Sequence, residues 1–101
     1  MTSTEGADAA TGAIVRRTIV IENERGLHAR AAAKFVQVAG RFEADVTVHK
    51  DGTVVSGRSI MGLMMLAAGL GCEIELAASG GDAEEALAAL AGLVAAKFEE
   101  T

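Results

Sequence analysis

A histidine near the start of the chain has the position and the neighbours that suit chemistry on an anion. His28 follows a turn at Gly26 and precedes a run rich in alanine, the best helix former. This order places the imidazole at a helix N-terminus, where backbone N–H groups without helical partners can bind an anion. The helix dipole there favours the neutral ring, whose free lone pair is a nucleophile. Alternatively, His28 is only a polar residue that caps the helix.

The charges around His28 favour the nucleophile. The segment 25–41 contains no acidic residue, although the whole chain carries a net charge of −5, and it contains four basic ones, Arg25, Arg30, Lys34 and Arg41. Arg30 can add a charge-assisted bond to a phosphoryl group that the backbone of Ala29 and Arg30 holds. Because no second general acid or base is apparent, we expect a carrier of an anionic group delivered by another protein, not an enzyme.

Composition excludes several function classes. Only 3% of residues are aromatic and the net charge is negative, so we expect no nucleic-acid partner. Cys72 is the single cysteine, and His28 and His49 lack the spacing of metal ligands, so we expect no disulfide, no metal and no cofactor. We see neither a signal peptide nor an apolar run long enough to cross a bilayer, which favours a cytoplasmic protein without a membrane partner.

Hydrophobic periodicity predicts the element order β-α-β-β-α-β-α after a disordered tail over residues 1–12, with one domain over 13–101. The strands are expected at 13–22, 44–49, 53–56 and 72–78, and the helices at 29–40, 59–68 and from Asp82 onward. Each strand has one apolar face, which predicts an α+β fold, a two-layer open-faced sandwich with an antiparallel sheet and helices on one side.

Local signals refine the ends of these elements. Asp51-Gly52 predicts a hairpin, and Ser59 is a good N-cap. Asp82 and Glu85 have the spacing of a capping box. The apolar stripe of the last helix is expected to contain Leu87, Leu90, Ala91, Val94 and Phe98.

The second helix presents a candidate docking surface. Leu63 and Leu66 are expected to face the core, which leaves Ile60, Met61 and Met64 pointing outward. A methionine-rich helix is usually part of a core, but outward methionines beside His28 suit adaptable protein contacts.

Two motifs then resemble a known family. Gly26-Leu27-His28-Ala29-Arg30, followed by two alanines, and the stretch Ser59–Leu66 are similar to the two motifs of HPr, the histidine-containing phosphocarrier of the phosphoenolpyruvate-dependent phosphotransferase system of sugar transport. The resemblance runs from about Ile14 to the C-terminus. It implies a four-stranded sheet of order 1-4-2-3 with three helices on one face, and we expect a monomer. It also implies that His28 Nδ1 accepts phosphate from enzyme I and passes it to an A-type subunit.

The resemblance also marks a regulatory position and two departures. Ser59 matches the serine that HPr kinase/phosphorylase modifies in some bacteria, although as an N-cap alone it would contribute about 1 kcal/mol. Ala31 replaces the usual proline, and we expect function to survive because the helix remains intact. Ala67 stands where glycine is common, which should let the helix run slightly further. The alternatives are a nitrogen-related regulatory carrier or a non-catalytic binding module.

Overall fold

The computed structural model describes residues 13–100, in the order β-α-β-β-α-β-α that the sequence predicts. The elements are β1 (Ile14–Val20), α2 (Ala29–Ala39), β2 (Asp45–Lys50), β3 (Thr53–Ser56), α3 (Ile60–Met65), β4 (Glu73–Ser79), α4 (Ala83–Ala95) and the short turn η1 (Lys97–Glu99). The predicted tail over 1–12 lies outside the described residues. None of the helices between residues 13 and 100 has the length and hydrophobicity that crossing a bilayer requires.

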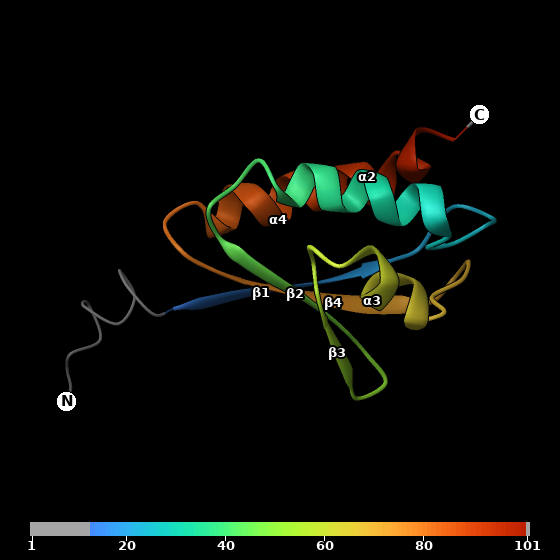
Figure 1. Ribbon diagram of the computed structural model, residues 1–101, viewed down its shortest axis with the longest axis horizontal. Helices are drawn as coiled ribbons and strands as arrows, with labels where there is room; N and C mark the ends of the chain where they lie inside the picture. Colours follow the sequence, from blue (N-terminus) through green and yellow to red (C-terminus); the bar gives the residue numbers. More distant parts are fainter. Residues whose placement is uncertain (1–12, 101) are drawn as a thin grey trace.

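The strands form one antiparallel sheet of order β1-β4-β2-β3, with the helices on one side (Figure 1). The predicted fold class is therefore confirmed. The inward side chains of the sheet pack against apolar faces of α2 and α4. Strands, helices and turns all contribute to this core, and its largest fully buried apolar side chains are Ile21, Phe35, Val48, Leu63, Ile74, Leu76, Leu87, Leu90, Val94 and Phe98. Ile21 is buried just beyond the end of β1, which is shorter than predicted.

The hairpin between β2 and β3 forms as the sequence predicts. Asp51 and Gly52 occupy its two-residue turn with positive φ angles of 50° and 84°. Two positive φ angles in succession match the twist of antiparallel strands, and Asp-Gly is suited to them. Local turn chemistry is therefore sufficient to specify this part of the sheet.

The predicted capping box at the start of α4 is wrong. Asp82 is the N-cap residue, but its side chain makes no capping hydrogen bond. Its carboxylate instead accepts bonds of 2.9 Å from the backbone N–H groups of Glu43 and Ala44, which precede β2. Two fixed donors from a distant segment satisfy both carboxylate oxygens, whereas a capping box would use only one of them.

The predicted extension of the second helix is also wrong. α3 ends at Met65, and Ala67 is left-handed, with φ at 53°. The following carbonyl, that of Ala68, accepts a hydrogen bond of 2.9 Å from the backbone N–H of Leu27. The chain therefore turns at Ala67 and reaches the loop before α2, although alanine is a residue that favours helix.

The last helix stops before Phe98, so the predicted stripe is correct only in part. Three residues in succession, Lys97, Phe98 and Glu99, have φ angles of 57°, 55° and 61°. Phe98 is buried through this left-handed turn and not as a continuation of the helical face. The turn directs the end of the described chain back toward α2 (Figure 1).

The left-handed backbone at residue 67 leads to a stability prediction. Ala67→Gly should raise the free energy of unfolding by about 0.5–1 kcal/mol, because glycine adopts positive φ without the steric cost that alanine incurs. Ala88→Gly, at an exposed helical position of α4, is the matched control and should lower stability by about 1 kcal/mol. Urea unfolding followed by far-ultraviolet circular dichroism measures both, and equal losses would contradict the assignment of strain to Ala67.

Candidate functional site

His28 stands at the junction between a loop and α2. Its backbone is extended (φ −74°, ψ 178°), and its carbonyl accepts the first hydrogen bond of the helix, 2.8 Å from the N–H of Ala32. His28 is the N-cap residue by position, but its side chain makes no capping hydrogen bond, so capping does not account for a histidine here. The N–H groups of Ala29, Arg30 and Ala31 come before that first bond and lie at the positive end of the helix.

The loop before His28 is fastened to the segment that follows α3. The N–H of Leu27 donates to the carbonyl of Ala68 at 2.9 Å. At Gly26, where φ is +64°, a Cβ atom would lie only 2.3 Å from that same carbonyl oxygen. Glycine is therefore required both by its backbone angle and by the close approach. This contact holds the end of α3 beside His28.

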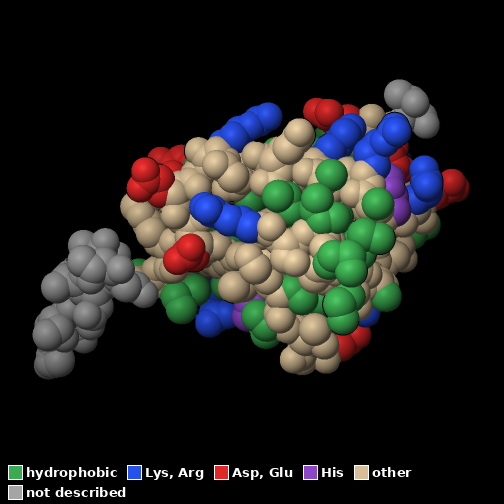
Figure 2. Space-filling view, viewed as in Figure 1, with side chains coloured by type: hydrophobic (Ala, Val, Ile, Leu, Met, Phe, Trp, Pro, Cys, Tyr) green, Lys and Arg blue, Asp and Glu red, His purple; other side chains and the backbone are tan. Residues whose placement is uncertain are grey.

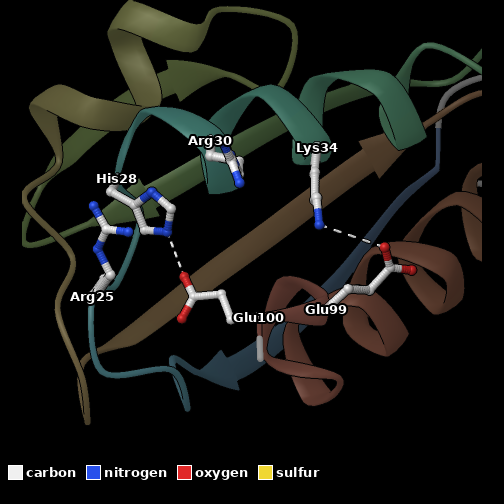
Figure 3. A pocket seen from close by; sticks show the side chains of 6 residues that line it. All are labelled: Arg25, His28, Arg30, Lys34, Glu99 and Glu100. Carbon is white, nitrogen blue, oxygen red and sulfur yellow. Dashed lines mark hydrogen bonds and ion pairs between the residues drawn. The ribbon is translucent and has the colours of Figure 1, made fainter.

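Six side chains surround a cavity of about 220 Å³ at this junction (Figure 3). They are Arg25, His28, Arg30, Lys34, Glu99 and Glu100. The three basic residues are among the four that the sequence grouped around the histidine, whereas the fourth, Arg41, does not line the cavity. The two carboxylates come from the C-terminal turn, so the patch that is purely basic in sequence contains acidic groups in space.

Glu100 contacts the histidine directly. Its Oε2 is hydrogen-bonded to Nε2 of His28 (Figure 3) and also accepts a bond of 3.0 Å from Nδ2 of Asn23. The pKa of the Glu100 carboxyl lies below its ordinary value, chiefly because of the bond to His28. Burial acts in the opposite direction, while the bond from Asn23 and the charge of Arg25 contribute to the lowering.

Asn23 supports this contact from the interior. Its side chain is almost completely buried, and besides Glu100 its Nδ2 donates to the carbonyl of Gly26 at 2.9 Å. Its Oδ1 has no hydrogen-bond partner. Since the opposite orientation of the amide would place that oxygen against two acceptors, the donor role toward Glu100 is the one consistent with its surroundings.

The C-terminal turn is also attached to α2. Nζ of Lys34 donates to the carbonyl of Phe98 at 2.8 Å and lies 3.5 Å from Oε1 of Glu99. Sequence analysis did not identify Asn23, Glu99 or Glu100 as parts of the site. No local pattern could have done so, because Glu100 is 72 residues away from His28 along the chain.

The other predicted residues lie close to this pocket or on the neighbouring helix. Ala29 and Arg30 are exposed on the first turn of α2. Ser59 is the N-cap of α3, and its Oγ accepts a hydrogen bond of 2.9 Å from the N–H of Gly62, as its expected capping role requires. Within residues 13–100, no cluster of His, Cys, Asp and Glu side chains could hold a metal ion.

The outward residues of α3 form a surface that we call the methionine face. It consists of Ile60, Met61 and Met64, which the sequence indicated, and Met65, which it did not. Met61 and Met65 are the most exposed, at 71% and 76%. Hydrophobic side chains gather over α3 next to the histidine and the Lys and Arg side chains around it (Figure 2). An anion site and an apolar surface therefore lie side by side.

A family model described as the PTS HPr component phosphorylation site matches residues 15–96. The chain belongs to the HPr family. It is 46% identical over 87 residues to the phosphocarrier protein HPr of Cupriavidus necator, with 86% of this chain and 98% of that protein covered. The crystal structure of HPr-C-His from Thermoanaerobacter tengcongensis has a TM-score of 0.82 and 46% identity, with coverage of 86% and 98%.

Relatives within the HPr family carry more than one name. The phosphocarrier protein NPr of Shewanella violacea is 43% identical over 86 residues, which is 85% of this chain and 94% of that protein. The HPr-like protein Crh of Bacillus subtilis is 48% identical over 81 residues, or 80% and 95% of the two chains. Family membership alone therefore does not fix the downstream acceptor.

The lowered pKa of Glu100 predicts a pH-dependent contribution to stability. Because the folded pKa is depressed, the ionised carboxylate stabilises the fold above the unfolded pKa, and this contribution is lost as the pH falls through the folded pKa. The difference in unfolding free energy between the wild type and Glu100→Gln should thus shrink on acidification. Urea unfolding between neutral and acid pH measures it.

Glu99→Gln is the matched control for this experiment. It removes a carboxylate from the same turn, but one that is exposed and pairs with Lys34 instead of the ring. We expect Glu99→Gln to lower the free energy of unfolding at neutral pH by less than Glu100→Gln does. A difference for Glu100→Gln that stays constant down to acid pH would contradict the prediction.

Proposed function

We propose that the protein is a phosphocarrier of the phosphoenolpyruvate-dependent phosphotransferase system. His28 accepts a phosphoryl group from enzyme I, which phosphoenolpyruvate charges, and passes it to an A-type subunit. The hydrogen bond between the ring of His28 and the carboxylate of Glu100 is the observation that supports this most directly. Nε2 of His28 faces the Glu100 carboxylate, which can only accept, so Nδ1 keeps its lone pair at the N-terminus of α2.

The transfer uses groups that already surround the ring. The lone pair of Nδ1 bonds to phosphorus while the bond from phosphorus to the donor's leaving atom breaks and its electron pair returns to the donor. The N–H groups of Ala29 and Arg30 and the guanidinium of Arg30 bind the phosphoryl oxygens. The protein takes up and gives away one group per cycle, with partner proteins completing each reaction, so it is not an enzyme.

The methionine face is the surface on which enzyme I and the A-type subunits dock. It lies beside the His28 pocket, since the loop before His28 is bonded to the end of α3. Flexible, unbranched methionine side chains suit partners of different shape. The carrier acts as a monomer and meets these partners in the cytoplasm.

Ser59 is a second modification site, for a kinase of the HPr kinase/phosphorylase type. Its Oγ lies at the start of α3, directly before the exposed Ile60 and Met61. A phosphate at a helix N-terminus need not unfold the helix, but it places about two negative charges on the docking surface. The main effect is then electrostatic repulsion of acidic partners.

Two alternatives differ in the acceptor or in the chemistry. A nitrogen-related regulatory carrier would use the same His28 chemistry with another acceptor, and the similarity to an NPr protein keeps this branch open. A non-catalytic binding module would use the methionine face without phosphate on the histidine. Phosphorylation by enzyme I separates the module from both carriers, and the choice of acceptor separates the carriers.

Replacement of the histidine tests the carrier function. Incubation with phosphoenolpyruvate and enzyme I should add one acid-labile, base-stable phosphate to the wild type and none to His28→Ala. His49→Ala is the matched control, because His49 lies on β2, is not among the residues that line the His28 pocket, and has its ring bonded to Thr47. It should accept phosphate at the wild-type rate. A wild type that stays unmodified by an enzyme I active on another carrier would refute the proposal.

A charged residue at position 59 tests the regulation. Ser59→Asp retains a good N-cap and should slow phosphorylation of His28 by enzyme I about tenfold at low salt, with a smaller effect at high salt. Thr53→Asp adds the same charge in the exposed β2–β3 hairpin and should leave the rate unchanged. Equal rates for Ser59→Asp and the wild type at low salt would count against the electrostatic account.

A further inference from the structure

The contact between Glu100 and His28 bears on which ring nitrogen reacts. A carboxylate can only accept hydrogen bonds, so Nε2 of His28 must carry the proton that the bond uses. A neutral imidazole has one proton, and Nδ1 is then the nitrogen with the free lone pair. In Figure 3, Nδ1 lies on the side of the ring away from Glu100, toward the start of α2.

We propose that Glu100 is a positioning residue for phosphoryl transfer, which holds His28 in the tautomer and orientation that present Nδ1 as the nucleophile. This inference rests on the proposed phosphocarrier function. A carboxylate that orients a histidine through its other nitrogen plays a similar part in serine proteases and at metal sites.

The C-terminal turn is built to hold the carboxylate in this place. Left-handed backbone at Lys97, Phe98 and Glu99 is unfavourable for each of these residue types. The turn is nevertheless kept by the burial of Phe98 and by the bond from Lys34 to its carbonyl. Since strained backbone persists only where the surroundings determine it, these contacts fix the direction in which Glu100 leaves the turn.

Asn23 restricts the carboxylate from the other side. Its amide is buried, and it donates both to Glu100 Oε2 and to the carbonyl of Gly26 in the loop that leads into His28. One buried side chain thus joins the carboxylate to the backbone that carries the histidine. This arrangement limits movement of Glu100 relative to the ring, as a positioning role requires.

The charge that develops during transfer gives Glu100 a second use. As Nδ1 bonds to phosphorus and the donor's bond to phosphorus breaks, the ring gains positive charge and its proton remains on Nε2. The carboxylate lies at that proton and balances the charge, so no proton has to enter or leave during the step. When the phosphoryl group moves on to an acceptor, the electron pair returns to Nδ1 and the same hydrogen bond persists.

Glu100→Gln tests the proposal, with Glu99→Gln as the matched control. The amide that replaces the carboxylate can donate as well as accept, so it does not select one tautomer. Long-range proton–nitrogen spectra of the ring should show a protonated Nε2 in the wild type and the control, and a mixture of tautomers in Glu100→Gln. The initial rate at which phosphorylated enzyme I modifies Glu100→Gln should be about tenfold lower than for the wild type, which is the lower end of what such orienting groups contribute.

Each other outcome has a defined meaning. An unchanged tautomer in Glu100→Gln overturns the positioning role, and so does an unchanged rate despite a mixed tautomer. A similar fall in the phosphorylation rate of Glu99→Gln would overturn it as well, because the effect would then come from the negative charge of the turn and not from the contact with the ring. A wild type that takes up no phosphate would refute the carrier function instead, since the tautomer measurement requires no donor.

Discussion

The carbonyl oxygen of Ala68 lies where a side chain on residue 26 would have to be, and the functional part of the molecule depends on this close approach. Gly26 permits it, and the N–H of Leu27 then bonds to that oxygen. One backbone contact therefore joins the start of α2 to the end of α3. Together with the direct packing of α2 against α3, this contact holds the imidazole and the methionine face in one fixed geometry, so that a single partner can contact both.

The basic side chains of the His28 pocket come together at this same junction. Arg25, Arg30 and Lys34 converge because two of them lie one helical turn apart on α2 and the third lies in the loop before it. An unbalanced group of cations would bind any anion. Glu99 and Glu100 reduce the net positive charge of the cavity without closing it, so the pocket retains donors for a phosphoryl group while its histidine is held from one side.

Local signals predicted the strands, the Asp51-Gly52 hairpin and the positions of His28 and Ser59 at helix starts, because alternation, turn residues and caps act within a few residues. The errors occurred where a distant partner competes with a local one. The carboxylate of Asp82 bonds the backbone of residues 43 and 44 instead of its own helix. Glu100 has no local pattern at all, and only tertiary packing brings it to the ring.

The left-handed residues around His28 show how that packing acts on the site. Ala67 precedes the carbonyl that bonds to Leu27, and the turn Lys97–Glu99 precedes Glu100. None of these residue types favours positive φ, and each conformation costs about 1–2 kcal/mol. Burial of Phe98 and the bonds to the two loops must offset that cost. The segments that orient His28 are therefore maintained by the folded core and not by their own conformational preferences. A loss of packing beneath them would displace the imidazole of His28 before it unfolded the sheet.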